Sequence, residues 1–367
     1  MRKRSYALGA VLVALVLVIL PACNLLGGGL KVGVVTDVGT VDDHNFNQYS
    51  WEGAQAGAND IGASSTVVVP QNSSDYATKI NDYVEQGYGI IVTVGFLLTN
   101  DTLTAAKANP DIDFIGVDQF PCITPEGAPD LTFACAGTGD IATLIPNFQG
   151  LLYAEAQAGY LAGIVAGSLT QTNEVATLGG PSFVPPVWNY MRGFQNGVAS
   201  VNPGAKVDYV YASEDPVQGF NDPDFGKTFG DQFLQQNPNV DFLFQVAGKT
   251  GNGFIAAACD AGIYAIGVDV DEHLSLDPSP ACLVTSAEKH LAASVQAAVN
   301  RTQDEAGYTG GIQFNDATND GIGLSGFYDY QSMITPEIQA AIDAALAGLA
   351  DGSVDECSPT PCTSDGT

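Results

Sequence analysis

Short apolar runs alternate with longer amphipathic stretches along most of the chain. Valine-rich runs of this length are typical of strands buried on both faces of a parallel sheet. The stretches between them have apolar residues at helical spacing, as at Tyr76, Ile80 and Tyr83. This alternation predicts an α/β architecture. The first series has expected strands at 30–35, 65–69, 89–94 and 113–117, and expected helices at 45–61, 75–86 and 99–108.

A second series of the same kind begins near Asn147. Its expected strands are 175–178, 205–211, 242–246, 264–268, 282–286 and 322–328, and its expected helices are 148–167, 188–198, 224–236, 251–261, 291–305 and 336–349. Two such series predict two open parallel-sheet lobes with a ligand cleft between them, because sites in these sheets lie at the carboxyl ends of the strands. We expect lobe 1 to comprise 31–145 plus about 270–308, lobe 2 to comprise 146–269 plus about 309–350, and 351–367 to be a disordered tail.

The N-terminal segment has the features of a secretion signal. Arg2, Lys3 and Arg4 precede an apolar run over 6–20, and Leu-Pro-Ala-Cys follows at 20–23. The run is too short to span a membrane, so 1–22 is interpreted as a signal peptide. A cysteine after a small residue resembles a bacterial lipobox, which predicts a lipidated Cys23 and a tether over 23–30. The protein would then be anchored on the extracytoplasmic side of the cell membrane. An ordinary cleaved signal, with Cys23 unmodified, is the alternative.

Composition narrows the function and the compartment. The chain has 41 acidic and 12 basic residues, a net charge of −29, so phosphate backbones would repel it and nucleic-acid binding is excluded as a main function. Six cysteines besides Cys23 fit an oxidising compartment. Zinc is disfavoured because there is no C-x-x-C pair and no histidine at ligand spacing, and no metal is expected. Sequence neighbours suggest three disulfides among fifteen possible pairings: Cys122–Cys135, Cys259–Cys282 and Cys357–Cys362.

Candidate binding residues follow several predicted strands. The segment over 35–53 contains Asp37, Asp42, Asp43, Phe46 and Asn47, with an aromatic ring in a polar turn. Either Asp42 or Asp43 could instead cap the helix that follows. Further candidates at strand ends or in a similar polar turn are Phe96, Asp118, Phe220, Gly248, Asp269 and Lys289. Gly-Lys-Thr at 248–250 is not a P-loop, because position 243 is leucine where that motif has glycine.

These motifs resemble those of the basic membrane protein family of lipoproteins, typified by purine nucleoside receptors of bacterial ABC importers. The resemblance covers nearly the whole chain after the signal. It departs from the family pattern at His44, at Lys249 and in an apparent insertion over 121–139. The matching segments are VTDVGTVDDHNFNQYSWEGA at 35–54, VGF at 94–96, IGVDQ at 115–119, AGYLAG at 158–163, FNDP at 220–223, AGKTGNG at 247–253 and GVD at 267–269.

The resemblance implies a type I periplasmic-binding-protein fold that closes on a nucleoside, without a cofactor and without enzymatic chemistry. Phe46 and Phe220 would stack on the base, although core packing is the alternative for each ring. Asn47 and Asp42 or Asp43 would bind the base edge. Asp118, Asp269 and Lys289 would hold the ribose hydroxyls, and Gly248 would let the backbone approach the ligand. The implied partners are a nucleoside and an ABC permease, and the receptor is expected to be a monomer.

Three other functions stay open. A sugar or signal-molecule receptor on the same fold would bind free pentose or hexose, whereas a nucleoside receptor requires the base. A metal-dependent nucleoside hydrolase would use Asp37, Asp42 and Asp43, but acids in turns are more commonly solvated and no EF-hand pattern is present. A surface adhesin or sensor would have no permease.

Overall fold

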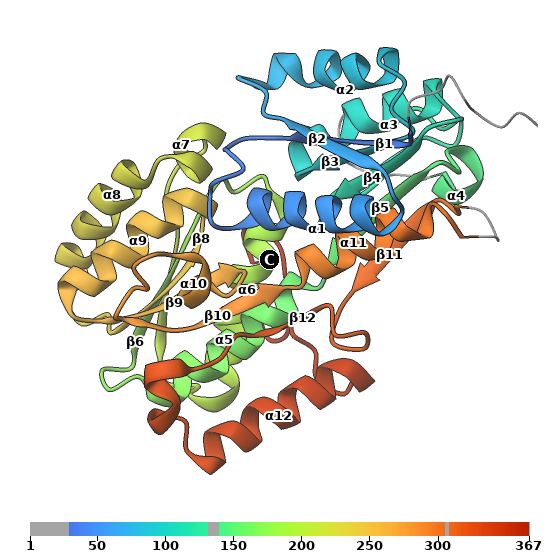
Figure 1. The fold of residues 1–367 in the computed structure, drawn as a ribbon. Coiled ribbons are helices and arrows are strands. Elements are labelled where there is room, and N and C mark those ends of the chain that lie inside the picture. The colour runs from blue at the N-terminus through green and yellow to red at the C-terminus, as the bar shows by residue number, and fades with distance from the viewer. Residues whose placement is uncertain (1–28, 131–138, 305–307, 367) are drawn as a thin grey trace, which may run out of the picture.

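Two six-stranded sheets form the two lobes of the molecule (Figure 1). The computed structural model describes residues 29–130, 139–304 and 308–366. Helices cover both faces of each sheet, so the central strands are buried on both sides. This explains why they have apolar runs rather than alternating polarity. The α/β prediction is confirmed.

The sheet of lobe 1 is entirely parallel. Its strand order is β2-β1-β3-β4-β5-β11. Helices α1 and α11 pack on one face, while α2, α3 and α4 pack on the other. The elements are β1 (Lys31–Thr36), α1 (Phe46–Asp60), β2 (Ser64–Val68), η1 (Ser73–Asp75), α2 (Tyr76–Glu85), β3 (Ile90–Val94), η2 (Phe96–Leu98), α3 (Thr99–Ala108), β4 (Asp113–Val117), α4 (Ile141–Leu144), β5 (Phe148–Tyr153), α11 (Leu291–Arg301) and β11 (Gly311–Asn315).

The sheet of lobe 2 has the equivalent order, β7-β6-β8-β9-β10-β12, and only the β10–β12 pair is antiparallel. Helices α5 and α6 cover one face, and α8 and α9 cover the other. The elements are α5 (Glu155–Leu169), β6 (Glu174–Gly179), α6 (Pro185–Val201), β7 (Lys206–Tyr211), α7 (Pro216–Asn221), α8 (Pro223–Gln236), β8 (Phe242–Val246), α9 (Gly248–Ala261), β9 (Tyr264–Asp269), α10 (Glu272–Ser275), β10 (Leu283–Lys289), β12 (Ile322–Leu324), η3 (Tyr328–Met333) and α12 (Pro336–Asp351).

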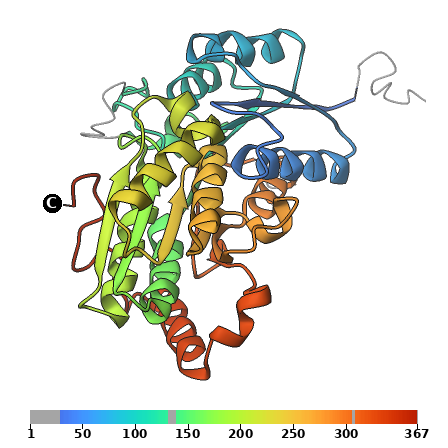
Figure 2. The ribbon, with the colours of Figure 1, turned by 90° about the vertical axis from the view of Figure 1, so that its left-hand side faces the viewer.

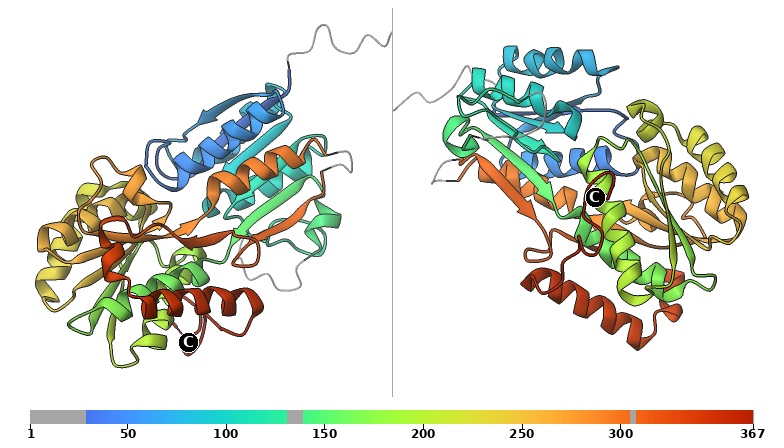
Figure 3. Two further views of the ribbon diagram at one scale, coloured as in Figure 1. Left: turned by 60° about the horizontal axis from the view of Figure 1, so that its bottom comes forward. Right: turned by 180° about the vertical axis from the view of Figure 1, so that it is seen from behind.

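The chain crosses between the lobes three times, after β5, β10 and β11 (Figure 3). The sheets therefore divide the chain differently from the expected bounds: 283–289 lies in lobe 2, whereas 148–153 and 311–315 lie in lobe 1. The expected helix over 148–167 is wrong in its first part. Residues 148–153 form β5, which pairs with β4 and β11, and the helix begins at Glu155. Pairing on both sides overrides the local preference of this small, apolar segment.

Glycines let the backbones of α5 and α6 touch. A Cβ on Gly159 would lie 2.1 Å from the carbonyl oxygen of Tyr190, and one on Gly197 would lie 2.0 Å from that of Tyr160. Real Cβ atoms do not approach this closely, so any larger residue would force the helices apart. The small-residue composition of α5 thus serves a close helix pair beneath the second sheet.

Both disulfide predictions that fall on described residues are confirmed, Cys259–Cys282 and Cys357–Cys362. Cys135 lies outside the described residues, so its pairing with Cys122 stays a prediction. Cys23 and the expected signal peptide over 1–22 also lie outside them. Among the described residues, no helix combines the length and the apolar character needed to cross a bilayer.

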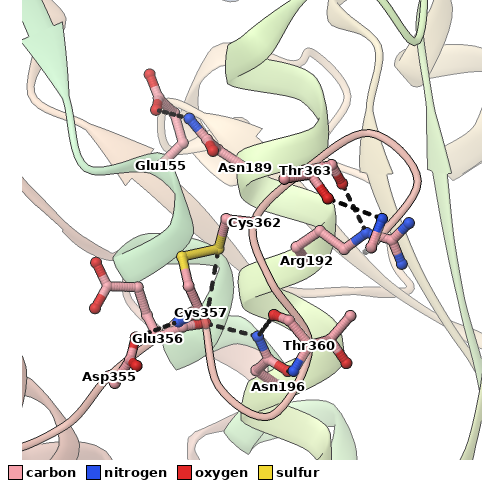
Figure 4. Close-up of a disulfide and its surroundings, with 11 residues drawn as sticks. Glu155, Asn189, Arg192, Asn196, Asp355, Glu356, Cys357, Thr360, Cys362 and Thr363 are labelled. Atoms are coloured by element: carbon pink, nitrogen blue, oxygen red, sulfur yellow. Dashed lines mark hydrogen bonds between the residues drawn. A yellow bond between two sulfur atoms is a disulfide. The ribbon is translucent and has the colours of Figure 1, made fainter.

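The C-terminal tail is held against α6, although it was expected to be disordered (Figures 2 and 4). Arg192 donates from Nε to the carbonyl oxygen of Thr363 at 3.0 Å and from Nη2 to that of Ser364 at 3.1 Å. Asn196 donates to the carbonyl oxygens of Glu356 and Thr360, both at 2.8 Å. The polar composition of the tail predicts disorder. It contains no information about the two polar side chains of α6 that bind the tail backbone.

Candidate functional site

The carboxyl ends of the two sheets line one cavity between the lobes. Strand order reverses between β1 and β3 in the first sheet and between β6 and β8 in the second, and such switch points are where α/β sheets bind ligands. The cavity holds about 690 Å³ of space free of atoms, the part open to solvent included. The predicted ligand-binding residues that line it are Asp37, Asp43, Phe46, Asn47, Phe96, Asp118, Phe220, Gly248, Asp269 and Lys289.

Asp42 is the predicted residue that the cavity lining lacks. Its side chain is 78% exposed, and its Oδ1 lies 3.6 Å from Nζ of Lys249. The hydroxyl of Thr40 and the charge of Lys249 lower the pKa of Asp42. Asp42 thus forms an exposed ion pair between lobe 1 and lobe 2.

Asp43 caps helix α1, the role that the sequence analysis gives as the alternative to ligand binding. Its Oδ1 accepts from the backbone N–H groups of Asn45 and Gln48, and its Oδ2 accepts from that of Asn47, each at 3.0 Å. Burial raises the pKa of Asp43, while these three hydrogen bonds favour the charged form. Asp43 therefore fixes the start of α1, and with it the positions of Phe46 and Asn47.

Asn47 lines the cavity and has a side-chain acceptor without a hydrogen-bond partner among the described residues. Its Nδ2 donates to the carbonyl oxygen of Val38 at 3.1 Å, which orients the amide. Its Oδ1 is buried and has no hydrogen-bond partner among the described residues. A buried acceptor without a partner is costly, so a ligand donor at this position would be favourable.

Phe46 and Phe220 reach the cavity from opposite lobes. Phe46 begins α1 in lobe 1, and Phe220 lies in α7 of lobe 2. Two glycines make room for the second ring: a Cβ on Gly180 would lie 2.7 Å from Cε1 of Phe220, and Gly248 has a φ of 51° beside it. Planar apolar surface therefore lines the cavity on both sides.

Asp37 is a buried carboxyl at the switch point of the first sheet. Its backbone N–H donates to the carbonyl oxygen of Val94 at 2.9 Å. A Cβ on Gly95 would lie 1.8 Å from Oδ2 of Asp37, and the φ of Gly95 is 111°, so only glycine fits there. Burial raises the pKa of Asp37 to about 8. At neutral pH this carboxyl is mostly protonated and can donate a hydrogen bond.

Lys289 lies at the centre of a buried charge cluster. Its Nζ is 2.6 Å from Oδ2 of Asp118, 3.3 Å from Oε1 of Glu155 and 3.6 Å from Oδ1 of Asp269. Burial lowers the pKa of Lys289, but the three carboxylates raise it further, so the amine stays charged. Burial raises the pKa of Asp118 to about 7 against the opposing effect of Lys289.

Asp118 and Asp269 occupy equivalent places in the two lobes. Asp118 follows β4 and Asp269 ends β9, and each of these strands is the second one beyond the switch point of its sheet. Both residues have a positive φ, 55° for Asp118 and 65° for Asp269. The Oδ1 atoms of both have no hydrogen-bond partner among the described residues. Two carboxylates, one from each lobe, therefore offer acceptors to a ligand that carries neighbouring hydroxyls.

Sequence reasoning missed Glu155, Tyr153 and Tyr190, which complete the Lys289 cluster. The Nζ of Lys289 lies 5.3 Å from the ring centroid of Tyr153 and 5.5 Å from that of Tyr190. Asn189 donates to Oε2 of Glu155 at 3.2 Å (Figure 4). A single acid in a run of small residues was the available signal for Glu155, but the mistaken helix over 148–167 placed it away from a strand end.

A buried contact between the lobes borders the site. Nδ2 of Asn45 donates to Oε1 of Glu272 at 2.7 Å and to the carbonyl oxygen of Val268 at 3.2 Å. Gln245 also donates to Oε1 of Glu272, at 2.8 Å. Burial raises the pKa of Glu272 to about 8. Asn45 belongs to lobe 1 and the other residues to lobe 2, so this contact holds the two lobes together.

The site is arranged for binding a polar, partly planar solute. Within the described ranges, no group of three or more His, Cys, Asp or Glu residues is placed to hold a metal ion. Aromatic rings flank the cavity, and its lining residues include buried carboxylate and amide oxygens without hydrogen-bond partners among the described residues. Such a combination fixes the orientation of a small molecule by hydrogen bonds and buries its apolar faces.

Comparison with known proteins identifies relatives over almost the whole chain. The family model for PnrA-like ABC transporter substrate-binding proteins, Bmp, matches residues 30–344. The ABC transporter nucleoside-binding protein BmpA of Lactococcus lactis is 27% identical, over 96% of this chain and 99% of its own. Basic membrane protein A of Borreliella burgdorferi is 23% identical, over 85% of this chain and 83% of its own.

The structure resembles those of solute-binding proteins. An ABC transporter solute-binding protein from Aeropyrum pernix superposes with a TM-score of 0.75 at 20% identity, covering 89% of this chain and 93% of that one. At this identity the likeness establishes the fold. It confirms the periplasmic-binding-protein architecture expected from the sequence motifs.

Proposed function

The chain belongs to the Bmp family of PnrA-like ABC transporter substrate-binding proteins, and from this premise we propose that it captures a nucleoside, preferentially a purine nucleoside, and delivers it to an ABC permease. Binding takes place without chemical conversion of the ligand. The named nucleoside-binding relative from Lactococcus lactis supports the ligand class. Purine preference is inferred from the site.

The observation that carries this proposal is the pairing of aromatic rings with unused buried acceptors in one cavity. Phe46 and Phe220 come from opposite lobes, so a flat base could be held between them. Oδ1 of Asn47 is available to the base edge. Base stacking on an aromatic side chain contributes about 1–3 kcal/mol. A purine, with two fused rings, offers more stacking surface than a pyrimidine.

The sugar is proposed to bind at the Lys289 cluster. The Oδ1 atoms of Asp118 and Asp269, which have no hydrogen-bond partner among the described residues, are suited to accept from the two hydroxyls of a vicinal diol. Lys289 holds both acids in place by charge. Because these two aspartates belong to different lobes, a ribose bound to both would favour the closed arrangement. Closure about the three crossings would then present the loaded form to the permease.

Membrane attachment is a further part of the proposal. The lipobox-like Leu-Pro-Ala-Cys at 20–23 supports a lipid on Cys23 and a position on the extracytoplasmic side of the cell membrane. The described disulfides are consistent with that compartment. The receptor is proposed to act as a monomer, since one chain contains both halves of the site.

Calorimetric titration of residues 24–367 tests the ligand class. The protein is first unfolded and refolded to remove any bound solute, then titrated with adenosine, guanosine, inosine, cytidine, uridine and ribose. We expect purine nucleosides to bind and ribose to give no heat. Binding of ribose alone, or no binding of any nucleoside, would refute the proposal while leaving the fold unchanged; the first result would instead indicate a sugar receptor.

The two rings are tested by Phe46→Ala and Phe220→Ala. Each is expected to weaken purine nucleoside binding by about 1–3 kcal/mol, roughly 5- to 150-fold. Phe225→Ala is the matched control, because Phe225 lies in α8, outside the cavity lining, and packs against Phe229. Equal affinities in all three variants would show that the rings do not stack on the ligand.

A further inference from the structure

A second cavity adjoins the candidate site. It holds about 1650 Å³ of space free of atoms, the part open to solvent included. Phe96, Leu97, Asp118 and Pro186 line both cavities, so the two lie side by side along these residues. Asp118 is the residue proposed to bind the sugar. The second cavity therefore borders the sugar end of the site, and its lining contains none of the residues proposed to bind the base, Phe46, Asn47 and Phe220.

Aromatic side chains from both lobes form the walls of this second cavity, which we call the aromatic groove. Phe120 and Phe314 come from lobe 1, and Phe183 and Trp188 come from lobe 2. Phe183 is 47% exposed and Phe314 is 48% exposed. Monomeric soluble proteins seldom expose such large apolar side chains together unless the patch binds something.

The charged residues of the aromatic groove are acidic. Asp118, Glu155 and Glu356 line it, and its described lining contains no Lys, Arg or His. An anionic group such as phosphate would meet apolar rings and acidic residues there, because Lys289 is already paired with Asp118 and Glu155 and does not itself line the groove. The groove is therefore suited to an uncharged, apolar group.

We propose that the aromatic groove is an extension of the ligand cleft that receives an apolar, uncharged substituent on the sugar of a bound nucleoside. This inference rests on the proposed function. With the base between Phe46 and Phe220 and the sugar diol on Asp118 and Asp269, the C5′ end of the sugar is the end to which this arrangement assigns no residue. A substituent on C5′ would extend past Asp118 into the groove, so the receptor would bind 5′-substituted nucleosides as well as simple ones.

Calorimetric titration with matched nucleosides tests the inference. The probes are adenosine, 5′-deoxyadenosine, 5′-methylthio-5′-deoxyadenosine, 5′-benzylthio-5′-deoxyadenosine and adenosine 5′-monophosphate, or the same series on the purine that binds best. We expect each thioether to bind about fivefold to tenfold tighter than the 5′-deoxynucleoside, because apolar surface is buried. The monophosphate should bind more weakly than the parent nucleoside.

Two variants locate the substituent. Phe314→Ala and Phe183→Ala should each reduce the gain from the benzylthio group about threefold or more, without changing the affinity for unsubstituted adenosine. Ile312→Ala is the matched control, because Ile312 is 45% exposed on the same strand, β11, and does not line the groove. It should leave the affinities for all probes unchanged.

The outcomes separate this inference from the proposed function. Binding of adenosine together with exclusion of both thioethers would overturn the inference alone, and so would a gain that neither Phe314→Ala nor Phe183→Ala reduces. In either case the groove would serve another contact, such as one with a protein partner. Failure of all nucleosides to bind the native chain would overturn both the inference and the proposed function.

Discussion

At the scale of single residues, the site depends on buried charges that share one cation. Lys289 is almost fully buried and contacts three carboxylates, two of them from the ends of equivalent strands in different lobes. Removal of one partner from a buried ion pair leaves an uncompensated charge, which costs more than the pair itself contributes. The cluster therefore links stability and ligand binding through one side chain.

Replacement of Lys289 should be strongly destabilising. We expect Lys289→Met to lower the free energy of unfolding by about 3–5 kcal/mol, because Asp118, Glu155 and Asp269 would lose their shared counter-charge. Lys206→Met is the control, since Lys206 pairs with Asp208 at the surface and is 55% exposed; its effect should stay below about 1 kcal/mol. Urea unfolding at pH 7 measures both, and equal losses would contradict this account of the cluster.

Glu272 should make stability depend on pH. Its pKa is raised from 4.5 to about 8, so between these values the folded state holds a proton that the unfolded chain releases. The free energy of unfolding must then fall as the pH rises through this window and level off above pH 8 as far as this group is concerned. Asp37, with a pKa of about 8, acts in the same direction.

The variant Glu272→Gln has no titrating group at this position. Its loss of stability between pH 5 and pH 8.5 should therefore be smaller than that of the native chain, by up to about 4 kcal/mol. Urea unfolding at the two pH values measures the difference. Glu337→Gln is the control, because Glu337 lies exposed in the first turn of α12 and should leave the loss as it is in the native chain. If the loss is the same in the native chain and both variants, Glu272 does not hold the proton.

At the scale of elements, most strands and helices were predictable because their apolar patterns are strong. The helix over 99–108 and the strand over 113–117 have their expected bounds. Strands β5 and β11 were not predictable: β5 runs without a break in composition into a small-residue helix, and β11 alternates in burial as an edge strand does. Their partners lie far away in sequence, and a local pattern contains no information about such pairing.

Prediction of the site was limited in the same way, because some of its residues are brought together only by packing. The cavity-lining residues that sequence motifs identified follow strands or open helices, as Asp118 and Phe46 do. Glu155 and Tyr190 come from helices of lobe 2 whose place beside Lys289 depends on packing. The positions of the motifs therefore indicated most of the residues that meet at the cavity. The residues that balance the charge of Lys289 could be identified only from the structure.

The close pairing of α5 and α6 predicts a large effect from a single methyl group. Gly197→Ala would place Cβ against the backbone of Tyr160, so the helices must separate. Alanine is more favourable than glycine inside a helix by about 1 kcal/mol, but overpacking typically costs about 1–3 kcal/mol. We therefore expect a net loss of stability. Gly204→Ala, where the added Cβ meets only Asn202 Oδ1 at 4.0 Å, is the control. Thermal unfolding compares them, and equal midpoints would contradict the close approach.

At the scale of the whole molecule, the lobes are joined by the three crossings and by contacts across the cleft. Asn45 contacts Glu272 and Val268 at a buried position, and Asp42 pairs with Lys249 at the exposed edge. Glu272 is protonated near pH 7, so each hydrogen bond of Asn45 is one between uncharged groups and is worth about 0.5–1.5 kcal/mol. These contacts exist only while the lobes are close together, so they favour the closed arrangement.

Removal of the Asn45 contact should favour opening. We expect Asn45→Ala to release bound nucleoside about tenfold faster with little change in the association rate, because the contact forms after the ligand has entered. Stopped-flow displacement measures the rates, and small-angle scattering of the ligand-free protein should give a larger radius of gyration. Gln48→Ala is the control, since Gln48 contacts His44 and Glu52 of lobe 1. Unchanged release from Asn45→Ala would mean that the contact does not restrain opening.

The exchange of strands at the crossings also has a consequence for folding during synthesis. The first sheet contains β1 to β5, complete by residue 153, but its edge strand β11 is not made until residue 315, after nearly all of the second sheet. A chain emerging from its N-terminus must therefore hold β5 as an open edge while the second lobe is built. A nascent chain stopped before residue 311 would expose that edge, so chaperone binding to partial chains should persist until β11 has been added.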